Sequence, residues 1–402
     1  MTDATVGELR PPLRSARALP ALAATLLPAL LLALVCAGCG QTSSLHPLAD
    51  HLPLGSRGPA SAHRPVRRAF RFFSPTSFWN EPLASDAPLA TNSSALVGDL
   101  DTQVAGLEAS NQGPWINTRD WSVPIYTVAA RQPTVRVRLV AAFAEHALQA
   151  SWNAVPLPPA AQPALGKDAH LVVWQPSRDR LWEFWHLQHS ASGWSAEWGG
   201  AMRHVSTSSG VYGPRSWPGA KPWWGASASS LSIAGGLITL EDLQRGSIDH
   251  ALAISITNVR AGVYASPAQR DDGVSGDPLA LPEGARLRLP ASLDLDALHL
   301  PKLTLEIARA AQRYGLVVRD RSFAIAFFAQ DPIPTGTEPY AGVDGYFEGR
   351  YPNELLAAFP WSQLQVLALS LHPNGPGSSS APAIGASSAC AGRCKPRPET
   401  DR

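Results

Sequence analysis

His170 and Glu183 are the side chains whose types and spacing most favour chemistry in this chain. Each lies in a strand-like run, and the turn 176–179 separates the two runs. If that turn has four residues, Val172 faces Glu183 across a hairpin and His170 becomes a diagonal neighbour of Glu183. A histidine and a carboxylate in this arrangement can share a proton or a water. We therefore predict a catalytic role for the pair, with Asp168 as the nearest further carboxylate.

Tryptophan is concentrated around this hairpin, because eight of the thirteen tryptophans lie between Asp168 and His250. Side chains alternate between the two faces of a strand, so a third strand at 194–199 adds its tryptophans to the face of His170 and Glu183. The tryptophans predicted on that face are Trp174, Trp185, Trp194 and Trp198. Pyranose rings stack their apolar C–H faces on aromatic planes, so we predict these four as ligand-binding residues for a glycan. A slip of one residue in register would exchange the two faces.

Three interpretations of the pair are open. In the first, apolar neighbours raise the pKa of Glu183, which then acts as the general acid of a glycoside hydrolase. In the second, a lyase takes its base from His170 or Tyr212, and its stabilising cation is Arg203 or Arg215. In the third, the pair is structural, since buried histidine and glutamate often satisfy each other and tryptophans fill cores. The further carboxylates that could complete a hydrolase are Asp168, Glu241, Asp249 and Asp320.

The remaining motifs are weaker. His186 and His189 have a metal-like spacing only on a helix, and here they are expected on a strand, so we predict no metal and no cofactor. His186 is expected to pair with Glu197 on the opposite face of the three strands at 169–199, and that face is predicted as core. His250 lies in line with apolar residues and is predicted as a core histidine with satisfied hydrogen bonds. The aromatic segment 217–224 is expected to be a lid, a ligand platform or a flap packed on the core.

The elements that must position these residues are short strands separated by turns. We predict a mainly β fold, with a β-sandwich or barrel-like antiparallel core and a few peripheral helices. The strand-like runs are 134–140, 169–175, 180–188, 194–199, 248–256, 316–318 and 323–328, with a turn at 319–320. A helix is expected at 240–245, because Thr239 and Asp242 form a capping box and Gly246 follows the last turn. A second helix is expected at 301–313.

The N-terminal residues predict export. Basic residues precede an apolar run that ends on small residues at Ala37-Gly-Cys39, as in a secretory signal. This ending resembles the lipobox of bacterial lipoproteins, which implies lipidation of Cys39, although Cys36 stands where the lipobox usually has leucine. Plain secretion and an uncleaved membrane anchor are the alternatives. We predict an extracytoplasmic protein that is either held at the outer face of the membrane by an N-terminal lipid or secreted.

Composition limits the partners. The chain has 33 lysines and arginines against 32 aspartates and glutamates, so no net field attracts nucleic acid and we predict no such partner. The predicted organisation is a signal peptide at 1–39, a flexible tether at 40–65, one β-rich domain at 66–370 and a disordered tail at 371–402. Cys390 and Cys394 lie in the tail, so the predicted domain must fold without a disulfide.

Several phrases resemble an uncharacterised family of secreted bacterial proteins. They are Ser77-Phe-Trp-Asn80, Asp168-Ala-His170, Trp182-Glu-Phe-Trp185 and Gly246-Ser-Ile-Asp-His-Ala-Leu252. The resemblance covers most of residues 70–370 as one unit and implies no activity. From the pair and the tryptophans, we expect a protein that acts on a cell-envelope or extracellular polysaccharide, as a hydrolase before a lyase. The alternative is a non-catalytic glycan-binding or structural envelope lipoprotein.

Overall fold

The computed structural model describes residues 71–141 and 145–375. All of them belong to one compact unit of the chain, Arg67–Arg402. The predicted signal peptide, the lipidation site Cys39, the tether and the cysteines of the tail lie outside the described residues. Within 71–141 and 145–375, no helix combines the length and the apolar character that crossing a membrane requires.

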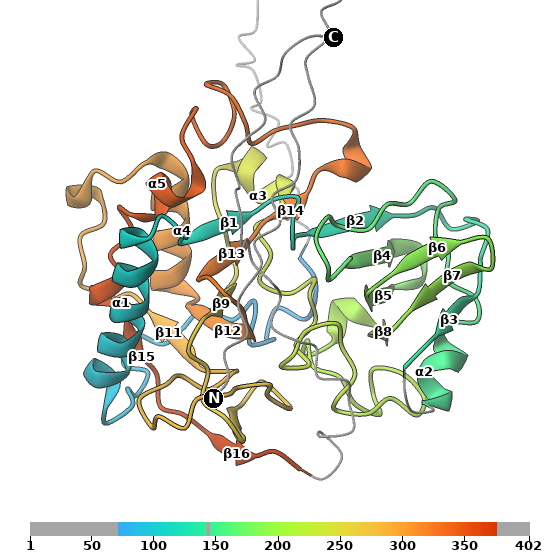
Figure 1. Cartoon of the computed structure of the whole chain (residues 1–402), viewed down its shortest axis with the longest axis horizontal. Helices are drawn as coiled ribbons and strands as arrows, with labels where there is room; N and C mark the ends of the chain where they lie inside the picture. Colours follow the sequence, from blue (N-terminus) through green and yellow to red (C-terminus); the bar gives the residue numbers. More distant parts are fainter. Residues whose placement is uncertain (1–70, 142–144, 376–402) are drawn as a thin grey trace, which may run out of the picture. The chain divides into compact units, whose positions relative to one another are not determined.

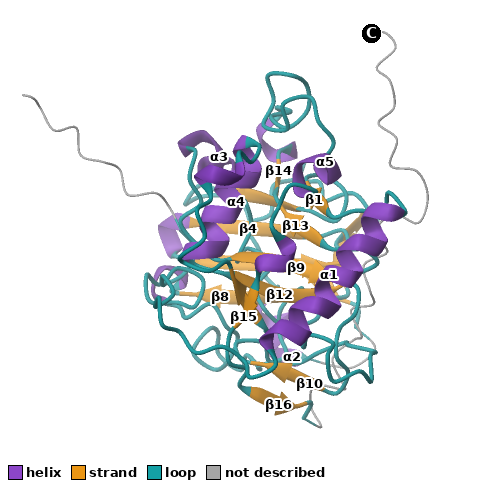
Figure 2. Ribbon diagram, turned by 90° about the vertical axis from the view of Figure 1, so that its left-hand side faces the viewer, coloured by secondary structure: helices purple, strands orange, loops and turns teal. Residues whose placement is uncertain are grey.

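A six-stranded mixed sheet occupies the left part of Figure 1, in the order β1-β13-β9-β12-β11-β15. Its strands are β1 (Trp115–Asn117), β9 (Leu252–Ile256), β11 (Arg286–Arg288), β12 (Leu316–Arg321), β13 (Ala326–Phe328) and β15 (Gln365–Val366). Helices α1 (Ser93–Ala109) and α4 (Lys302–Arg313) lie on opposite sides of these strands in Figure 2. A short helix, α5 (Pro352–Leu356), contacts α4 and β1. The apolar faces of these helices and the sheet form one hydrophobic core.

A five-stranded mixed sheet carries the predicted hairpin, in the order β14-β2-β4-β5-β8. Its strands are β2 (Val123–Thr127), β4 (Leu171–Gln175), β5 (Arg180–Trp185), β8 (Trp198–Arg203) and β14 (Gln330–Asp331). All residues of β4 are buried, as are all but one of β5 and all but one of β8, so both faces of these strands are covered. A second hydrophobic core, rich in tryptophan, surrounds this sheet.

Two small sheets and two short helices complete the described fold. A three-stranded sheet joins β3 (Val137–Leu139), β7 (Gly193–Ala196) and β6 (Gln188–Ser190), near helix α2 (His146–Ser151) in Figure 1. The other sheet pairs β10 (Val263–Ala265) with β16 (Leu371–Pro373). Residues 371–373, which were predicted to begin the tail, therefore form a strand. Helix α3 (Leu240–Arg245) lies close to the ends of β13 and β14 in Figure 1.

The prediction of a mainly β fold is confirmed, since the described residues form sixteen strands and five α-helices. These strands close no barrel. The expectation of an antiparallel core is corrected, because each of the three larger sheets mixes parallel and antiparallel pairs. The parallel pairs are β1 with β13, β9 with β12, β2 with β4 and β14, and β3 with β7.

Local signals predicted several elements well. Helix α3 has the expected bounds and the expected capping box between Thr239 and Asp242, and Gly246 ends it in a left-handed conformation with φ of 70°. The hairpin register is also as predicted, because Val172 lies opposite Glu183. Both features depend on residues close in sequence, which is why the sequence pattern was sufficient to predict them.

Other predicted elements differ in extent or pairing. The turn expected at 319–320 is wrong, since β12 continues to Arg321 with an irregularity in register between Val318 and Asp320. The reason is the full burial of Arg319, whose guanidinium lies 3.9 Å from the ring centroid of Phe328 and donates to backbone carbonyls. β13 pairs with β1 and β9 and does not form a hairpin with β12. The strands at 134–140 and 248–256 are shorter, β3 and β9 respectively.

Candidate functional site

Glu183 lies in the middle of β5 and is completely buried, with 0% of its surface exposed. Its Oε1 accepts a hydrogen bond from the Ala226 amide at 2.8 Å. Its Oε2 accepts from the Ser232 hydroxyl at 2.6 Å and from the Ile233 amide at 3.1 Å. Burial raises the pKa of Glu183, and these hydrogen bonds oppose the rise. The carboxyl is thus held by the 226–233 segment and has no contact with solvent.

His170 is held by the same segment. Its Nε2 donates to the Ala226 carbonyl at 3.2 Å, while Nδ1 is buried without a partner among the described residues. Burial, together with the positive charge of Arg319, lowers the pKa of His170 to about 3, so the imidazole is neutral near pH 7. Ala226 therefore connects the predicted pair, with its N–H on Glu183 and its C=O on His170. No hydrogen bond joins the two side chains directly in the described structure.

Asp168, the third predicted catalytic residue, is buried beside Trp185. Its Oδ1 accepts from Trp185 Nε1 at 3.3 Å, and burial raises the pKa of Asp168 to about 6 against that hydrogen bond. Trp185 stacks on His186 with ring centroids 3.7 Å apart. His186 Nδ1 lies 3.0 Å from Glu197 Oε1, which confirms the predicted pairing of these two residues.

The four predicted ligand-binding tryptophans do not form one platform. Trp198 is fully buried and its Nε1 donates to the Trp223 carbonyl at 3.2 Å. Trp194 lies on β7 and stacks on His189 at 4.4 Å, so it belongs to a different sheet from the one expected. The reason is that β6 and β7 form a hairpin in the three-stranded sheet. The strand that pairs with β5 is therefore β8, which follows them in sequence. Trp174, in contrast, lines a pocket.

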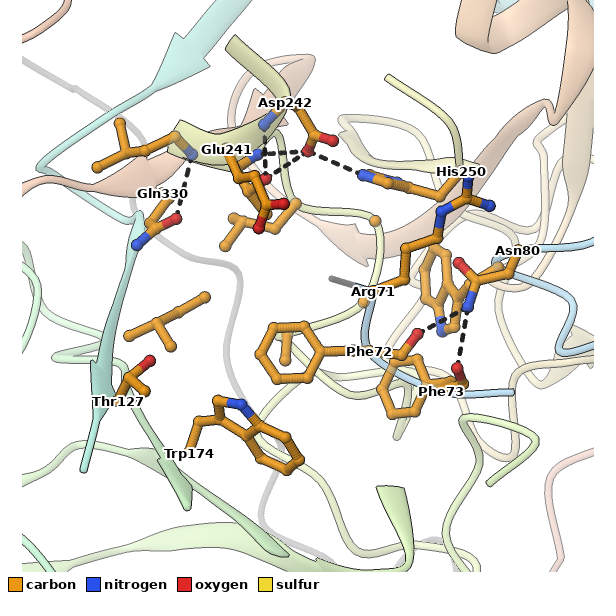
Figure 3. Close-up of a pocket in the computed structure, with 18 of the residues that line it drawn as sticks. Arg71, Phe72, Phe73, Asn80, Thr127, Trp174, Glu241, Asp242, His250 and Gln330 are labelled. Carbon is orange, nitrogen blue, oxygen red and sulfur yellow. Dashed lines mark hydrogen bonds and ion pairs between the residues drawn. The ribbon is translucent and has the colours of Figure 1, made fainter. Parts of the chain in front are cut away.

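This pocket has a volume of about 460 Å³ and lies between the segment 71–80, the five-stranded sheet and α3 (Figure 3). We call it the aromatic pocket. Its aromatic residues are Phe72, Phe73, Trp79 and Trp174. Phe72 meets Trp174 edge to face, with ring centroids 5.5 Å apart. Across the pocket from them, Figure 3 shows the carboxylates of Glu241 and Asp242 and the amide of Gln330.

The segment that carries Phe72 and Phe73 is tightly fixed. Phe73 adopts a left-handed conformation with φ of 71°, which is rare for an aromatic residue and needs support from its surroundings. Asn80 supplies it, because its Nδ2 donates to the Phe72 carbonyl at 2.7 Å and to the Phe73 carbonyl at 3.2 Å. Trp79, further along the same segment, packs directly on Gly235 and Gly236. A side chain at either glycine would collide with the Trp79 ring.

An ion pair forms the wall near α3. Asp242, held by the capping box, lies 3.1 Å from His250 Nε2, and His250 Nδ1 lies 2.9 Å from the Ala251 carbonyl. Both ring nitrogens thus face acceptors, an arrangement that the doubly protonated imidazolium satisfies. Burial lowers the pKa of His250, but the charge and hydrogen bond of Asp242 outweigh it and raise the pKa above 6.5. Burial likewise raises the pKa of Asp242, but His250 and Thr239 bring it down to about 2.

The His250–Asp242 pair predicts a pH-dependent stability. Because the pKa of Asp242 is about 2 against an ordinary 3.8, its contribution is present above pH 3.8 and is lost as the pH falls towards 2. Because the pKa of His250 is raised above 6.5, its contribution is complete below pH 6.5 and is lost as the pH rises through the folded value.

We expect His250→Gln to lower the free energy of unfolding by about 2 kcal/mol between these limits, and by less outside them. Urea denaturation of both proteins from pH 2 to pH 9 measures the difference. A difference that stays constant across this range would contradict the ionic assignment.

The charges of the aromatic pocket nearly cancel. The carboxylates of Glu241 and Asp242 are matched by the guanidinium of Arg71 and the imidazolium of His250. Arg71 also lies 3.6 Å from Asp249, and Glu241, half exposed, lies 3.9 Å from Arg245. A balanced lining of this kind suits a polar but uncharged ligand better than an ion.

The described residues contain no group of three or more His, Cys, Asp or Glu side chains placed to hold a metal ion. Comparisons with family models, with curated proteins and with solved structures found no match to this chain.

Sequence reasoning missed most of the aromatic pocket. The segment 71–73 was treated only as the start of the domain, and Gln330 carried no signal at all. The sequence predicted the ion pair in part, since the capping box placed Asp242 correctly and His250 was predicted to have satisfied hydrogen bonds. The sequence did not indicate that these two residues meet, or that they do so at a pocket.

Proposed function

We propose that this protein binds a glycan in the aromatic pocket. The observation that supports this most is the pairing of one aromatic wall with one polar wall in a space of about 460 Å³. Phe72 and Trp174, with 9% and 5% of their surface exposed, form the apolar wall for the C–H face of a sugar. Glu241 and Gln330 offer oxygen and amide groups for its hydroxyls. The balanced charge of the lining favours a neutral sugar unit.

We favour binding over hydrolysis because of the environment of Glu183. A general acid must reach the glycosidic oxygen, whereas Glu183 has no exposed surface and accepts three hydrogen bonds from the 226–233 segment. In the aromatic pocket itself, the low pKa of Asp242, about 2, keeps that carboxylate ionised and unable to donate a proton. The hydrolase expectation therefore becomes the second candidate, and the glycan-binding alternative becomes the first.

The location proposed for this activity is the outer face of the membrane. It depends on the export signal in residues 1–39 and on lipidation of Cys39, which would keep a glycan-binding domain beside the cell envelope. Membership of the secreted bacterial family suggested by Ser77-Phe-Trp-Asn80 and the related phrases is part of the same proposal.

Trp174→Ala is expected to weaken glycan binding about tenfold or more, because it removes the ring on which the sugar stacks. Trp194→Ala is the matched control, since Trp194 is also buried but lies in another sheet. Affinities for a panel of envelope and extracellular polysaccharides, by retention and calorimetry, give the comparison. Equal losses in the two variants, or a loss confined to Trp194→Ala, would contradict the proposed site. Release of new reducing ends by the unmodified protein would establish the hydrolase instead.

A further inference from the structure

A second pocket, of about 640 Å³, lies between the end of β8 and the 207–216 loop. We call it the cationic pocket. Its lining is polar and basic and includes Arg203, Tyr212, Arg215 and Gln269. Of the described residues that line it, none is acidic, and none is shared with the aromatic pocket. Its chemistry is therefore different from that of the aromatic pocket.

Arg203, which lines this pocket, is brought beside Arg180, and neither makes an ion pair with a carboxylate within the described residues. Arg180 and Arg203 lie directly opposite each other in the β5–β8 register, where like charges destabilise a sheet. The indole of Trp217 supports both, with the guanidinium carbons of Arg203 and Arg180 at 4.3 Å and 5.6 Å from its ring centroid. Burial and the charges of Arg203 and Arg178 lower the pKa of Arg180, as expected for uncompensated positive charge. Asp179, on the adjoining turn, accepts hydrogen bonds from Ser206 and does not line the pocket.

Three lining residues have a buried polar atom without a hydrogen-bond partner among the described residues: Arg203, Tyr212 and Gln269. The Tyr212 hydroxyl lies against Gly200 and the buried Glu183. The other two atoms are Arg203 Nε, a charge-bearing donor, and Gln269 Oε1, an acceptor. The orientation of the Gln269 amide is fixed, because its Nε2 donates to the Tyr212 carbonyl at 2.9 Å. Arg215 is exposed and makes no hydrogen bond or ion pair within the described residues. A donor on Arg203 and an acceptor on Gln269, both without partners and both on residues of one lining, fit a ligand that supplies an oxyanion and a hydroxyl.

We propose that the cationic pocket binds a hydroxylated carboxylate, of which a uronic-acid unit of a glycan is the fitting example. Its carboxylate lies against the guanidinium groups of Arg203 and Arg215, whose planar donors match a carboxylate. A sugar hydroxyl donates to Gln269 Oε1. This site is independent of the glycan proposed for the aromatic pocket, because the two pockets have no lining residue in common.

The test measures binding of three small probes to the full-length protein: glucuronate, glucose and inorganic phosphate. We expect glucuronate to bind most tightly, because it alone carries both the carboxylate and the hydroxyls. Arg215→Gln should weaken glucuronate binding about tenfold, as the loss of one hydrogen-bonded charge implies, while the exposed position of Arg215 leaves folding intact. Arg136→Gln is the matched control, since it removes the same charge at an exposed position outside the pocket.

Each other outcome would overturn the proposal. Equal affinity for glucose and glucuronate would show that the arginines do not bind the carboxylate. Phosphate binding as tightly as glucuronate would show that Gln269 does not bind a sugar hydroxyl. Equal weakening in Arg215→Gln and Arg136→Gln would reduce the effect to general surface charge. Absence of glucuronate binding would refute the site. Trp174→Ala, which is expected to impair the aromatic pocket, should bind glucuronate with unchanged affinity, so failure of one pocket is distinguishable from failure of the other.

Discussion

Gly236→Ala is expected to lower the free energy of unfolding by about 4 kcal/mol. Gly236 has φ of +68°, a conformation that costs an L-residue roughly 1–2 kcal/mol. A Cβ at this position would lie 2.4 Å from the Ala253 amide nitrogen and 2.5 Å from the Trp79 ring, so backbone and indole must both move. Overpacking of this kind costs about 1–3 kcal/mol more. Because Trp79 lines the aromatic pocket, glycan affinity should fall as well.

Gly98→Ala provides the matched control with the opposite expected sign. Gly98 lies inside helix α1, and a Cβ there would meet no heavy atom within 4 Å apart from its chain neighbours and the backbone of its own helix. Alanine is a better helix former than glycine, so we expect Gly98→Ala to stabilise the protein by about 0.5–1 kcal/mol. Urea denaturation measures both variants. A Gly236→Ala protein as stable as the unmodified one would show that Trp79 does not pack on the glycine pair as described.

Glu183→Gln is expected to lower the free energy of unfolding by about 3 kcal/mol and to leave glycan affinity unchanged. Both carboxyl oxygens accept backbone N–H groups, from Ala226 and from Ile233. Whichever way the glutamine amide is turned, its NH₂ group faces one of these donors. A buried donor then loses its acceptor, which costs about 1–3 kcal/mol.

Glu197→Gln is the control for this substitution, since Glu197 is also a paired carboxylate but its side chain is 43% exposed. Loss of the Glu197 charge should change the free energy of unfolding by about 0.5 kcal/mol or less. Denaturation gives the stabilities, and binding and reducing-end assays on the folded variants give the function. If Glu183→Gln retained full stability and abolished the release of sugar from a polysaccharide, Glu183 would be the general acid of a hydrolase.

The part of the fold that could be predicted is the part fixed by near neighbours. The capping box of α3 and the register of the β4–β5 hairpin each depend on residues a few positions apart. The sequence pattern did not indicate that β6 and β7 leave the larger sheet, or that β9 lies between β12 and β13. Those pairings depend on which distant strand completes each sheet, and alternation along one strand carries no information about that.

The predicted pair illustrates the same limit for the site. Sequence position correctly suggested that His170 and Glu183 lie close to each other, but their partners come from residues 226–233, which no local pattern connects to the hairpin. These partners cover the face that was expected to bind a ligand. The aromatic pocket is assembled from segments near residues 72, 127, 174, 242 and 330, so only the three-dimensional fold brings its two walls together.

If the aromatic pocket binds the glycan, the sugar contacts Trp174 and not the other tryptophans of the hairpin region. Titration of the ¹⁵N-labelled protein with the polysaccharide fragment that it retains, followed on the indole N–H signals of its thirteen tryptophans, tests this directly. We expect the signals of Trp174 and Trp79 to shift in proportion to saturation, with those of Trp185, Trp194 and Trp198 unchanged. Shifts confined to Trp185, Trp194 and Trp198 would contradict the account and return the binding site to the face predicted from the sequence.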